Sequence, residues 1–435
     1  MNTLTIKLKQ HTPLIHFQHD QDGATLRASE VKPKLDKFIL TRLGNGDYQT
    51  GINTAKDNRW LIGKGEHPAL DYKLRVEALN PEKWNINERQ EYTRRHEERN
   101  KPFIQQGNKR YLAKRRRSDR RLICDLKQYP LFFANMDADI NDATEYRKFS
   151  FVEDPLTLVF TIKNDELFHF ISDADLLNDF FFQTNFGTRQ SKGFGSFSID
   201  TSDVLYRARR SMYRFRIKEN IFNDTKTINE EYQKVFEYID LLYKALRGGI
   251  NLKNGKGETL FYFKSLAYKY AYDVLEAKWD KRKIKEEFYH IERENMPNTY
   301  DIKDMLGFST NEQWMNQNND SITKESDLAE RMQSPILFKP FYDDATGSYT
   351  IHIILQDKKV NMDGFKETGT VRISSKNARR TFNIELPQSF STQSYFDYIF
   401  NTLDFDISNH VEEKYHHHRL YRDLEYMFTQ IKDNL

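Results

Sequence analysis

Glycine is concentrated at one point of this sequence. The segment FGTRQSKGFGSF at residues 186–197 holds three of the chain's 18 glycines, together with an arginine and a lysine. Glycine tolerates positive φ and lets the backbone approach a neighbour closely, so this segment is expected to fold as a tight loop. A helix-like apolar stretch precedes it and a short alternating stretch, GSFSID, follows it. The chain is therefore expected to pass here from a helix to a strand.

The rest of the first half supplies the elements around this loop. Alternation of apolar and polar residues predicts strands at 4–9 and 156–162. Two amphipathic stretches predict helices, one capped by Ser29 with Pro33 in its first turn, the other capped by Ser172. The order is strand, helix, insertion, strand, helix, glycine loop, strand. It fits a ferredoxin-like βαββαβ unit with a large segment inserted in its middle.

The pattern partly restarts in the second half. Strands are predicted in SPILFKPF and SYTIHIILQ. The helices expected there lie at about 228–246, within 263–288, at 391–403 after Ser391 or Thr392, and in the charged tail 409–434. We therefore predict an α+β fold with two ferredoxin-like (RRM-like) domains, residues 1–205 and residues 206–435, the second with helical elaborations.

A basic segment interrupts the first domain, and we predict an insertion at about 45–150. Residues 82–121 contain 14 Lys or Arg against 6 Asp or Glu, and the run KRRRSDRR has six basic residues in eight positions. A block of one charge is either a solvated face or lies opposite an anion. If an anion binds there, its contacts are Arg115, Arg116 and Arg117.

Two cations within a glycine loop suit a phosphate-bearing ligand. Arg189 and Lys192 lie beside backbone N–H groups that glycine leaves accessible. The loop is not a nucleotide-binding P-loop, because Gly193 follows the lysine where Ser or Thr is needed, and its glycines lack the dinucleotide-binding spacing. The alternative is a helix-to-strand turn that needs glycine only for its geometry.

Composition narrows the class of protein. The chain has 67 basic and 64 acidic residues, so the distribution of charge matters more than its sum. Its single cysteine, Cys124, cannot form an intrachain disulfide, and no apolar run is long enough to cross a bilayer. We expect a soluble, cytoplasmic protein. The run His416–His418 could bind a metal, but a solvated helix face is the interpretation we favour.

The glycine loop resembles a loop of the RAMP superfamily of CRISPR-associated proteins, which has the form G-R-x-x-K-G-F-G-S. In that family the loop lies between the last helix and last strand of an RRM-like domain and grips RNA. HTPLIHF and LRASEVKPKLDKFI are similar to the family's first strand, loop and first helix, although Lys32-Pro33 replaces its usual lysine–glycine pair. The chain most resembles the first RAMP subunit of the type III-B (Cmr) effector complex, which has two fused RAMP domains. RMQSPILFKPF at 331–341 is similar to a strand motif in that subunit's C-terminal half.

The resemblance implies a set of RNA contacts. Basic side chains would neutralise phosphates, while Phe194 would either stack on a base or, because it begins a strand, lie in the core. Lys253 and Lys256, in the second Gly/Lys loop RGGINLKNGKG, are less specific candidates. The residues matched to the family motif are Arg27, Lys32, Gly187, Arg189, Lys192, Gly193, Phe194 and Gly195.

We accordingly expect a non-catalytic subunit of a type III CRISPR effector complex, active in antiviral defence. It would help to hold guide (crRNA) and possibly target RNA beside other RAMP subunits, with no cofactor and no metal. A RAMP-family endoribonuclease that processes guide RNA is the alternative, since some relatives keep a catalytic histidine in the loop after the first strand. This chain has HFQHD there, with His16, His19 and Asp20. A housekeeping RNA-binding protein is a further alternative.

Overall fold

The chain forms two compact units in a computed structural model. The first comprises Met1–Arg210, Ile217–Glu237 and Lys339–Tyr349, and the second comprises Ser211–Arg216, Tyr238–Phe338 and Thr350–Leu435. The residues that the structure describes are 1–15, 25–63, 68–78, 82–85, 87–89, 91–115, 120–128, 148–223, 225, 228–291, 295–314, 320–327, 331–402 and 405–435.

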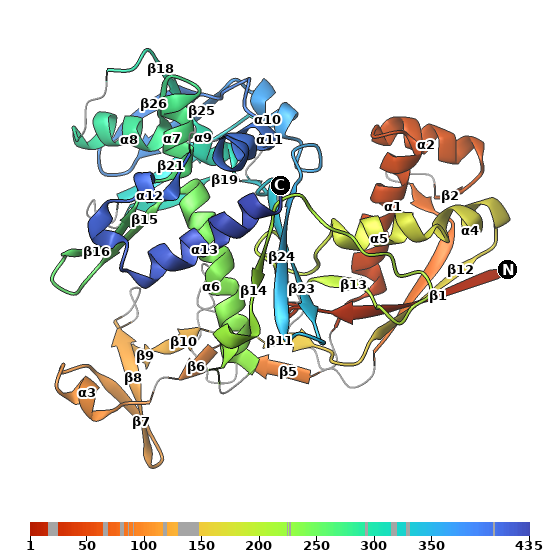
Figure 1. Ribbon diagram of the computed structural model, residues 1–435, viewed down its shortest axis with the longest axis horizontal. Coiled ribbons are helices and arrows are strands. Elements are labelled where there is room, and N and C mark those ends of the chain that lie inside the picture. The colour runs from red at the N-terminus through yellow and green to blue at the C-terminus, as the bar shows by residue number, and fades with distance from the viewer. Residues whose placement is uncertain are drawn as a thin grey trace. The chain divides into compact units, whose positions relative to one another are not determined.

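A four-stranded antiparallel sheet organises the first unit (Figure 1). Its strand order is β13-β1-β12-β4, formed by β1 (Asn2–Gln10), β4 (Tyr72–Glu77), β12 (Leu156–Ile162) and β13 (Phe197–Ile199). In the central pair Ile6 lies opposite Leu158. Alternate residues of β1 and β12 are buried, so one face of the sheet carries the core, as the sequence pattern predicts.

Three helices cover that face of the sheet: α1 (Ala28–Leu43), α4 (Asp165–Ile171) and α5 (Ala174–Phe182). The apolar side of α1 packs against α5 and β4. The positions of α1 and α5 were predicted and α4 was not, and both predicted caps were wrong. Arg27 occupies the N-cap of α1, and Ser172 ends α4, while the Asp173 carboxylate accepts from the N–H of Asp175 and caps α5.

The segment predicted as one insertion, residues 45–150, contributes a strand to the main sheet. β4 pairs antiparallel with β12 over its whole length, from Tyr72 opposite Ile162 to Glu77 opposite Thr157. The prediction that all of 45–150 stands outside the framework is therefore wrong. The other elements of this segment are α2 (Tyr48–Asp57), β2 (Leu61–Ile62), β3 (Ala69–Leu70), β5 (Glu82–Asn85), β6 (Asn87–Arg89), α3 (Arg94–Glu97), β7 (Phe103–Gln106), β8 (Lys109–Arg115), β9 (Leu122–Cys124), β10 (Leu126–Gln128) and β11 (Lys148–Phe151).

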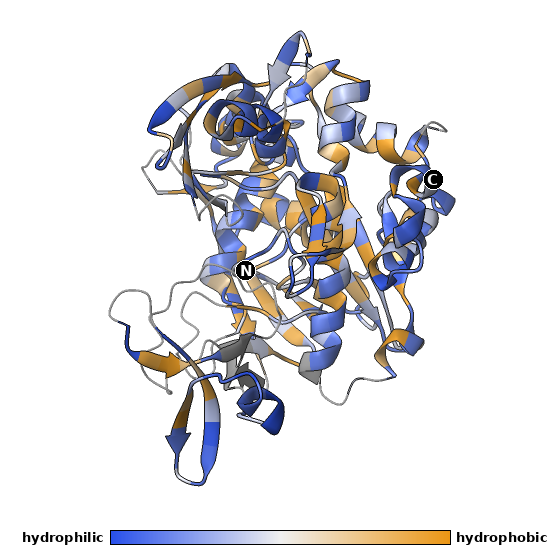
Figure 2. Cartoon of the chain, turned by 90° about the vertical axis from the view of Figure 1, so that its left-hand side faces the viewer, coloured by the Kyte–Doolittle hydropathy of each residue, from blue (hydrophilic) through white to orange (hydrophobic). Residues whose placement is uncertain are grey.

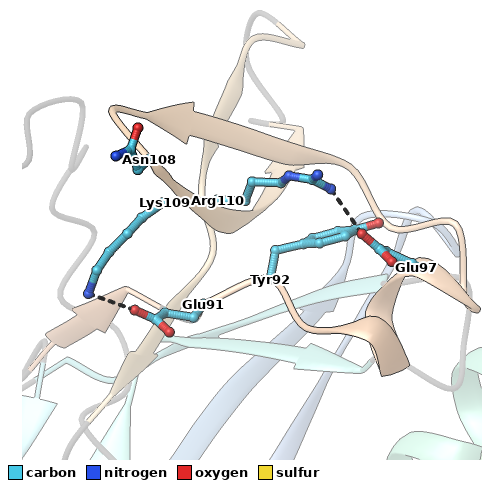
Figure 3. Close-up of a pocket in the computed structure, with 6 residues that line it drawn as sticks. All are labelled: Glu91, Tyr92, Glu97, Asn108, Lys109 and Arg110. Carbon is cyan, nitrogen blue, oxygen red and sulfur yellow. Dashed lines mark hydrogen bonds and ion pairs between the residues drawn. The ribbon is translucent and has the colours of Figure 1, made fainter.

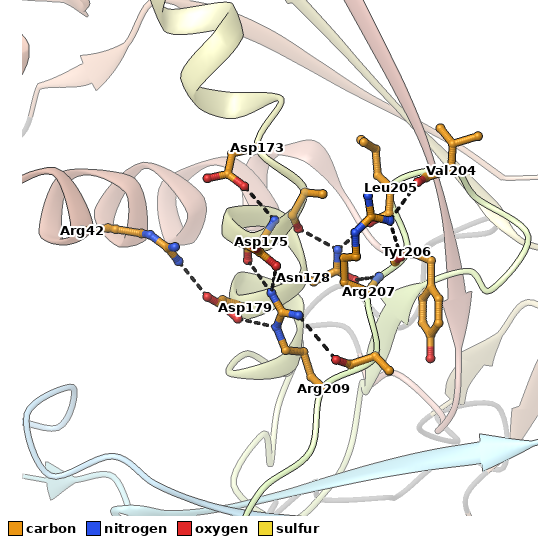
Figure 4. Close-up of polar contacts among 12 residues, drawn as sticks. Arg42, Asp173, Asp175, Asn178, Asp179, Val204, Leu205, Tyr206, Arg207 and Arg209 are labelled. Carbon is orange, nitrogen blue, oxygen red and sulfur yellow. Dashed lines mark hydrogen bonds and ion pairs between the residues drawn. The ribbon is translucent and has the colours of Figure 1, made fainter.

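A cluster of ion pairs holds the chain that leaves the first sheet against α5 (Figure 4). Arg209 pairs with both Asp175 and Asp179, and Arg42 of α1 reaches the second oxygen of Asp179 at 2.7 Å. Asn178 adds backbone bonds, donating to Leu205 O at 2.7 Å. The 200–210 segment is thus fixed by side chains of α5 before it enters the second unit.

A six-stranded mixed sheet organises the second unit, in the order β17-β18-β26-β25-β21-β20. A separate sheet has the order β14-β24-β23, and a hairpin joins β15 to β16. Strands β23 and β24 coincide with SPILFKPF and SYTIHIILQ, as predicted. The strands of this half are β14 (Arg214–Ile217), β15 (Ile250–Lys253), β16 (Thr259–Phe263), β17 (Ala277–Trp279), β18 (Asn298–Tyr300), β19 (Phe308–Ser309), β20 (Asn311–Trp314), β21 (Asp320–Glu325), β22 (Arg331–Met332), β23 (Ile336–Asp343), β24 (Ser348–Leu355), β25 (Thr370–Ser375) and β26 (Arg380–Glu385).

The helices of this half agree with the sequence prediction in part. α6 (Ile228–Arg247) and the Ser391-capped α11 (Thr392–Phe396) were predicted. The helical region expected within 263–288 is instead two helices, α7 (Leu266–Asp273) and α8 (Asp280–Tyr289), separated by β17. The remaining helices are η1 (Glu219–Phe222), α9 (Ile302–Met305), α10 (Met362–Glu367), η2 (Asp397–Asn401), α12 (Ile407–His410), η3 (Glu413–Tyr415) and α13 (Arg419–Asp433).

Figure 2 shows hydrophobic and hydrophilic residues interspersed along most helices and strands, and a largely hydrophilic α3. Throughout the described ranges, no helix is both long enough and apolar enough to span a membrane.

Candidate nucleic-acid interface

All three glycines of the loop have positive φ, with +88° at Gly193, and at the other two a side chain would also overlap the backbone of a neighbouring segment. Gly187 and Gly195 have φ of +74° and +62°. A Cβ atom at Gly187 would lie 2.5 Å from the carbonyl oxygen of Ile15, and one at Gly195 would lie 2.1 Å from that of Phe186. Both glycines are therefore required by backbone angle and by close approach together.

Residues of the first strand's C-terminal extension hold the loop. The Thr12 hydroxyl, fully buried, donates to Gly193 O at 2.6 Å and accepts from Ser196 N at 3.0 Å. Gly195 N donates to Pro13 O at 2.8 Å. These bonds attach the loop's end to residues 12–13, so its backbone is fixed before any ligand arrives.

The first two turns of α1 hold the other end of the loop. The Glu30 carboxylate accepts from Gly187 N, and Lys34 Nζ donates to Asn185 O and to Gln190 Oε1, each at 3.1 Å. Lys34 also lies 3.5 Å from Glu30. Burial lowers the pKa of Lys34, and Glu30 opposes that shift. Sequence reasoning missed both residues, although the i,i+4 spacing of Glu30 and Lys34 is a visible signal.

The structure brings three of the predicted cations to this region. Arg189 and Lys192 belong to the loop itself, and both are half-buried. Arg189 has φ of +56°, unusual for a residue with a Cβ atom, and its carbonyl accepts from Lys192 N at 2.9 Å. Arg27, at the N-cap of α1, lies one turn before the Glu30 that binds Gly187.

Lys32 points elsewhere. Its Nζ donates to Asp36 at 2.7 Å and to Leu70 O at 2.9 Å, and it lies 4.0 Å from the centre of the Tyr72 ring. Burial and the neighbouring Asp36 raise the pKa of Tyr72 well above its usual value. In this structure Lys32 thus ties α1 to β3 and β4, away from the glycine loop.

Phe194 lies in the core of the first unit. Its side chain is fully buried and its ring stacks on Phe236 with centroids 3.9 Å apart and planes 6° apart. A ring in this position has no exposed face on which a base could stack. Of the two interpretations offered by the sequence, the core one describes this geometry.

Two buried polar residues beside the loop were not anticipated. Lys339, fully buried, donates to Thr184 O at 2.9 Å and Phe197 O at 2.8 Å, the residues on either side of the loop. His11 stacks on Phe341 with centroids 4.8 Å apart and shares a 2.7 Å hydrogen bond with Ser198. A single charge inside the apolar run ILFKPF was the available signal for Lys339.

The basic segment forms a small sheet, β7-β8-β9, and a pocket lies between its β7–β8 turn and residues 91–97 (Figure 3). Lys109 pairs with Glu91 at 3.0 Å and Arg110 with Glu97 at 2.9 Å, so two of its cations are neutralised locally. The other pocket-lining residues are Tyr92 and Asn108.

Only part of the arginine run is described. Arg115 ends β8, is exposed, and donates to Arg120 O at 3.3 Å. Arg116 and Arg117 lie outside the described residues, and so do His16, His19 and Asp20 of HFQHD. Within the described part of the chain, no group of three or more His, Cys, Asp or Glu side chains is arranged to hold a metal ion.

Comparison with known proteins gives two family matches that together span most of the chain. The family model of the Cmr1 N-terminal domain matches residues 1–250, and that of the Cmr1 C-terminal domain matches residues 262–432. A solved structure with a similar chain is the type III-B Cmr-beta complex, determined by cryo-EM with cognate target RNA, AMPPnP and single-stranded DNA. The likeness has 12% identity and a TM-score of 0.33, and covers 82% of this chain and 97% of that one. No curated protein matches the sequence.

Proposed function

This chain belongs to the Cmr1 family of RAMP subunits from type III-B CRISPR effector complexes, and we propose that it works there as a non-catalytic RNA-binding subunit in antiviral defence. In this proposal its partners are the guide (crRNA), the target RNA as a further ligand, and other RAMP subunits. The solved complex named above contains target RNA together with Cmr subunits, which is compatible with this assignment.

We propose further that the first unit is a ferredoxin-like RAMP domain. Its antiparallel order β13-β1-β12-β4 is the fourth-first-third-second order of a βαββαβ unit, with β4 as second strand and α1 and α5 as the two helices. The sheet β14-β24-β23 has the first-third-second order of the same unit. This supports two RAMP domains, residues 1–205 and 206–435, with the six-stranded sheet as an elaboration of the second.

The proposal is based mainly on the hydrogen bonds that hold the backbone of the glycine loop in place. Glu30, Lys34, Thr12 and Pro13 hold its backbone from two sides. A loop fixed in this way carries Arg189 and Lys192 on a backbone that needs no further ordering on binding. We therefore propose that Arg27, Arg189 and Lys192 contact the phosphates of single-stranded RNA, with Arg115–Arg117 adding charge. The N–H groups of Gly187, Gly193 and Gly195 already donate to Glu30, Gln190 O and Pro13 O, so in this proposal the glycines shape the loop that the RNA approaches.

The test removes the loop's charge without changing its fold. Arg189→Ala with Lys192→Ala should weaken binding of single-stranded RNA and reduce its log–log salt dependence by about 0.7 per lost phosphate contact. The matched control is Lys37→Ala with Lys56→Ala, two exposed lysines of α1 and α2 in the same unit. The control should melt like the parent protein, since exposed charge changes cost within about 0.5 kcal/mol. Arg189 and Lys192 are half-buried, so a thermal melt must first show that the loop variant is folded at the temperature of the binding assay.

Two results would contradict the proposal. If the loop variant and the control bind RNA equally well, the loop is a turn that needs glycine for geometry alone. If the isolated protein cleaves guide-precursor RNA and His16→Ala abolishes the cleavage, the chain is an endoribonuclease, and the non-catalytic role is wrong.

A further inference from the structure

A second basic region lies in the second unit, far along the chain from the glycine loop. Residues 247–285 contain ten Lys or Arg and four Asp or Glu, although the whole chain has 67 against 64. The region comprises the β15–β16 hairpin, α7, β17 and the first half of α8. It includes Lys253 and Lys256, which the sequence had marked as less specific RNA candidates. A local excess of this size favours an anionic partner.

Aromatic rings alternate with cations on this region. Tyr268 of α7 stands at the centre: Lys264 Nζ lies 3.5 Å from its ring centroid and the Arg282 guanidinium carbon lies 5.2 Å from it. Tyr272, one turn further on, stacks toward Tyr268 with centroids 6.1 Å apart and planes 24° apart. Trp279 meets Tyr268 edge-on from the buried side. The result is a short column of rings flanked by positive charge.

The outer rings of this column are accessible. The Tyr272 side chain is 51% exposed, and Tyr262 of β16 is 39% exposed beside Leu260, which is 46% exposed. Asp273 is the one carboxylate next to Tyr272 in the chain, and it pairs with Lys269 at 2.6 Å. Its charge is therefore compensated and does not repel an anion at Tyr272.

We propose that these residues form a second contact surface for single-stranded RNA, here called the tyrosine–lysine surface: Tyr262, Lys264, Tyr268, Tyr272 and Arg282. Unpaired bases stack on Tyr272 and Tyr262, while Lys264, Arg282 and the hairpin lysines lie along the phosphates. The inference rests on the proposed function in taking RNA as the ligand, but it uses different residues in the other unit.

The charge pattern favours RNA over a protein partner. The buried centre of a protein interface is depleted in charged residues, and lysine in particular is scarce there. Surfaces that bind single strands combine aromatic stacking platforms with a cationic track for the backbone, and they accept any base sequence. Lys264 and Arg282 beside the Tyr268 ring, with the exposed Tyr272 next to it, match the second description.

The decisive experiment is photocrosslinking of the full-length protein to a 4-thiouridine-containing oligouridine, with the crosslinked peptides mapped by mass spectrometry. We expect crosslinks at Tyr272 or Tyr262. Tyr272→Ala should weaken oligouridine binding about fivefold or more, the low end of the effect of losing one stacking platform. Tyr272→Phe keeps the ring and should bind like the parent. Lys358→Ala, an exposed lysine of the same unit outside this surface, is the charge control.

Parallel measurement of the Arg189→Ala/Lys192→Ala variant separates this inference from the proposed function. If the loop variant binds oligouridine weakly while Tyr272→Ala binds and crosslinks like the parent, the tyrosine–lysine surface is overturned and the loop proposal stands. The reverse pattern supports the surface and overturns the loop. A parent protein that does not bind oligouridine overturns both. Unchanged RNA binding by Tyr272→Ala together with loss of another Cmr subunit from the assembled complex would show a protein-binding surface instead.

Discussion

Replacing Gly195 by alanine tests how firmly the glycine loop is held. At this residue φ is +62°, and a new Cβ would lie 2.1 Å from Phe186 O, nearly 1 Å inside the closest approach that real Cβ atoms make. The backbone must move to relieve that overlap. The two bonds at risk are Gly195 N to Pro13 O, at 2.8 Å, and Phe186 N to Gly195 O, at 3.0 Å.

The expected cost follows from these contacts. A left-handed backbone angle costs a residue with a Cβ about 1–2 kcal/mol. Each of the two backbone bonds contributes about 1 kcal/mol. Gly195→Ala should therefore lower the free energy of unfolding of the first unit by about 3–4 kcal/mol. Gly46→Ala is the control for the backbone angle, because Gly46 also has positive φ, at +103°, but no atom lies within 4 Å of the new Cβ; it carries the cost of the angle without the overlap.

Hydrogen exchange of the β1 and β12 amides as a function of urea measures this quantity for the first unit separately. Gly195→Ala should lose about 2 kcal/mol more than Gly46→Ala and should also bind RNA more weakly, because its loop is displaced. Equal losses in the two variants would refute the reasoning, since they would mean that the loop moves aside freely and that its contacts with Pro13 and Phe186 contribute little.

Three further predictions concern other charged groups. Burial lowers the pKa of Lys281 to about 8. Between about pH 8 and about pH 10.5 the unfolded chain therefore binds more protons at this residue than the folded chain, so the free energy of unfolding of the parent, relative to that of Lys281→Met, should rise across this range. Urea titrations at several pH values measure this difference. Lys324 is fully buried between Asp304 at 2.6 Å, Glu312 at 3.3 Å and Asp280 at 3.6 Å; Lys324→Met should destabilise the second unit by about 3–5 kcal/mol, and a loss below 1 kcal/mol in urea unfolding would contradict this. Arg209→Ala removes the pairs with Asp175 and Asp179, so limited trypsin digestion should cut within 200–210 faster than in the parent, and an unchanged rate would show that Asn178 alone holds this segment.

Strands of the main sheet were predicted correctly where we used the alternation of apolar and polar residues. The strand β4 was missed where we gave more weight to charge. β1 and β12 were predicted from alternating residues, and β4 carries the same signal in YKLRVE, with Tyr72, Leu74 and Val76 on one side. It was assigned to the insertion because basic residues crowd the sequence nearby. Period-two alternation reports burial on one face and is independent of how many charges the other face carries. Such a strand is therefore compatible with a strongly basic neighbourhood.

The prediction of one helical region within 263–288 was wrong for a different reason. Tyr- and Lys-rich sequence has acceptable helix propensity throughout, yet β17 interrupts it, with Ala277, Lys278 and Trp279 all buried. β17 pairs in parallel with β18, which lies some twenty residues further on. Pairing with a distant strand is a tertiary effect that local propensity does not encode.

The site illustrates the limit of matching a motif one residue at a time. Lys32 was chosen from the family pattern, but Lys34 is the lysine that binds the glycine loop. Residues two apart on an α-helix point about 200° away from each other, so α1 can direct only one of the two toward the loop. The rotation of α1 about its own axis decides which lysine faces the loop. That rotation is set by Val31, Leu35 and Ile39, which are buried in the core. The apolar spacing reveals that buried stripe, and the loop's position relative to it comes only from the assembled fold.

The ion pair between Glu30 and Lys34 separates the residues that hold the loop from the residues available to attract an anion. Glu30 is needed to bind Gly187 N, and a carboxylate there would by itself repel a phosphate. Lys34, 3.5 Å away and largely buried, offsets that charge, so the pair fastens the loop while adding almost no net field. The attraction for an anion must then come from cations outside the pair. In the described part of this region those cations are Arg27, Arg189 and Lys192, and in the proposed role they would bind phosphate from positions on or beside a backbone that is fixed from two sides.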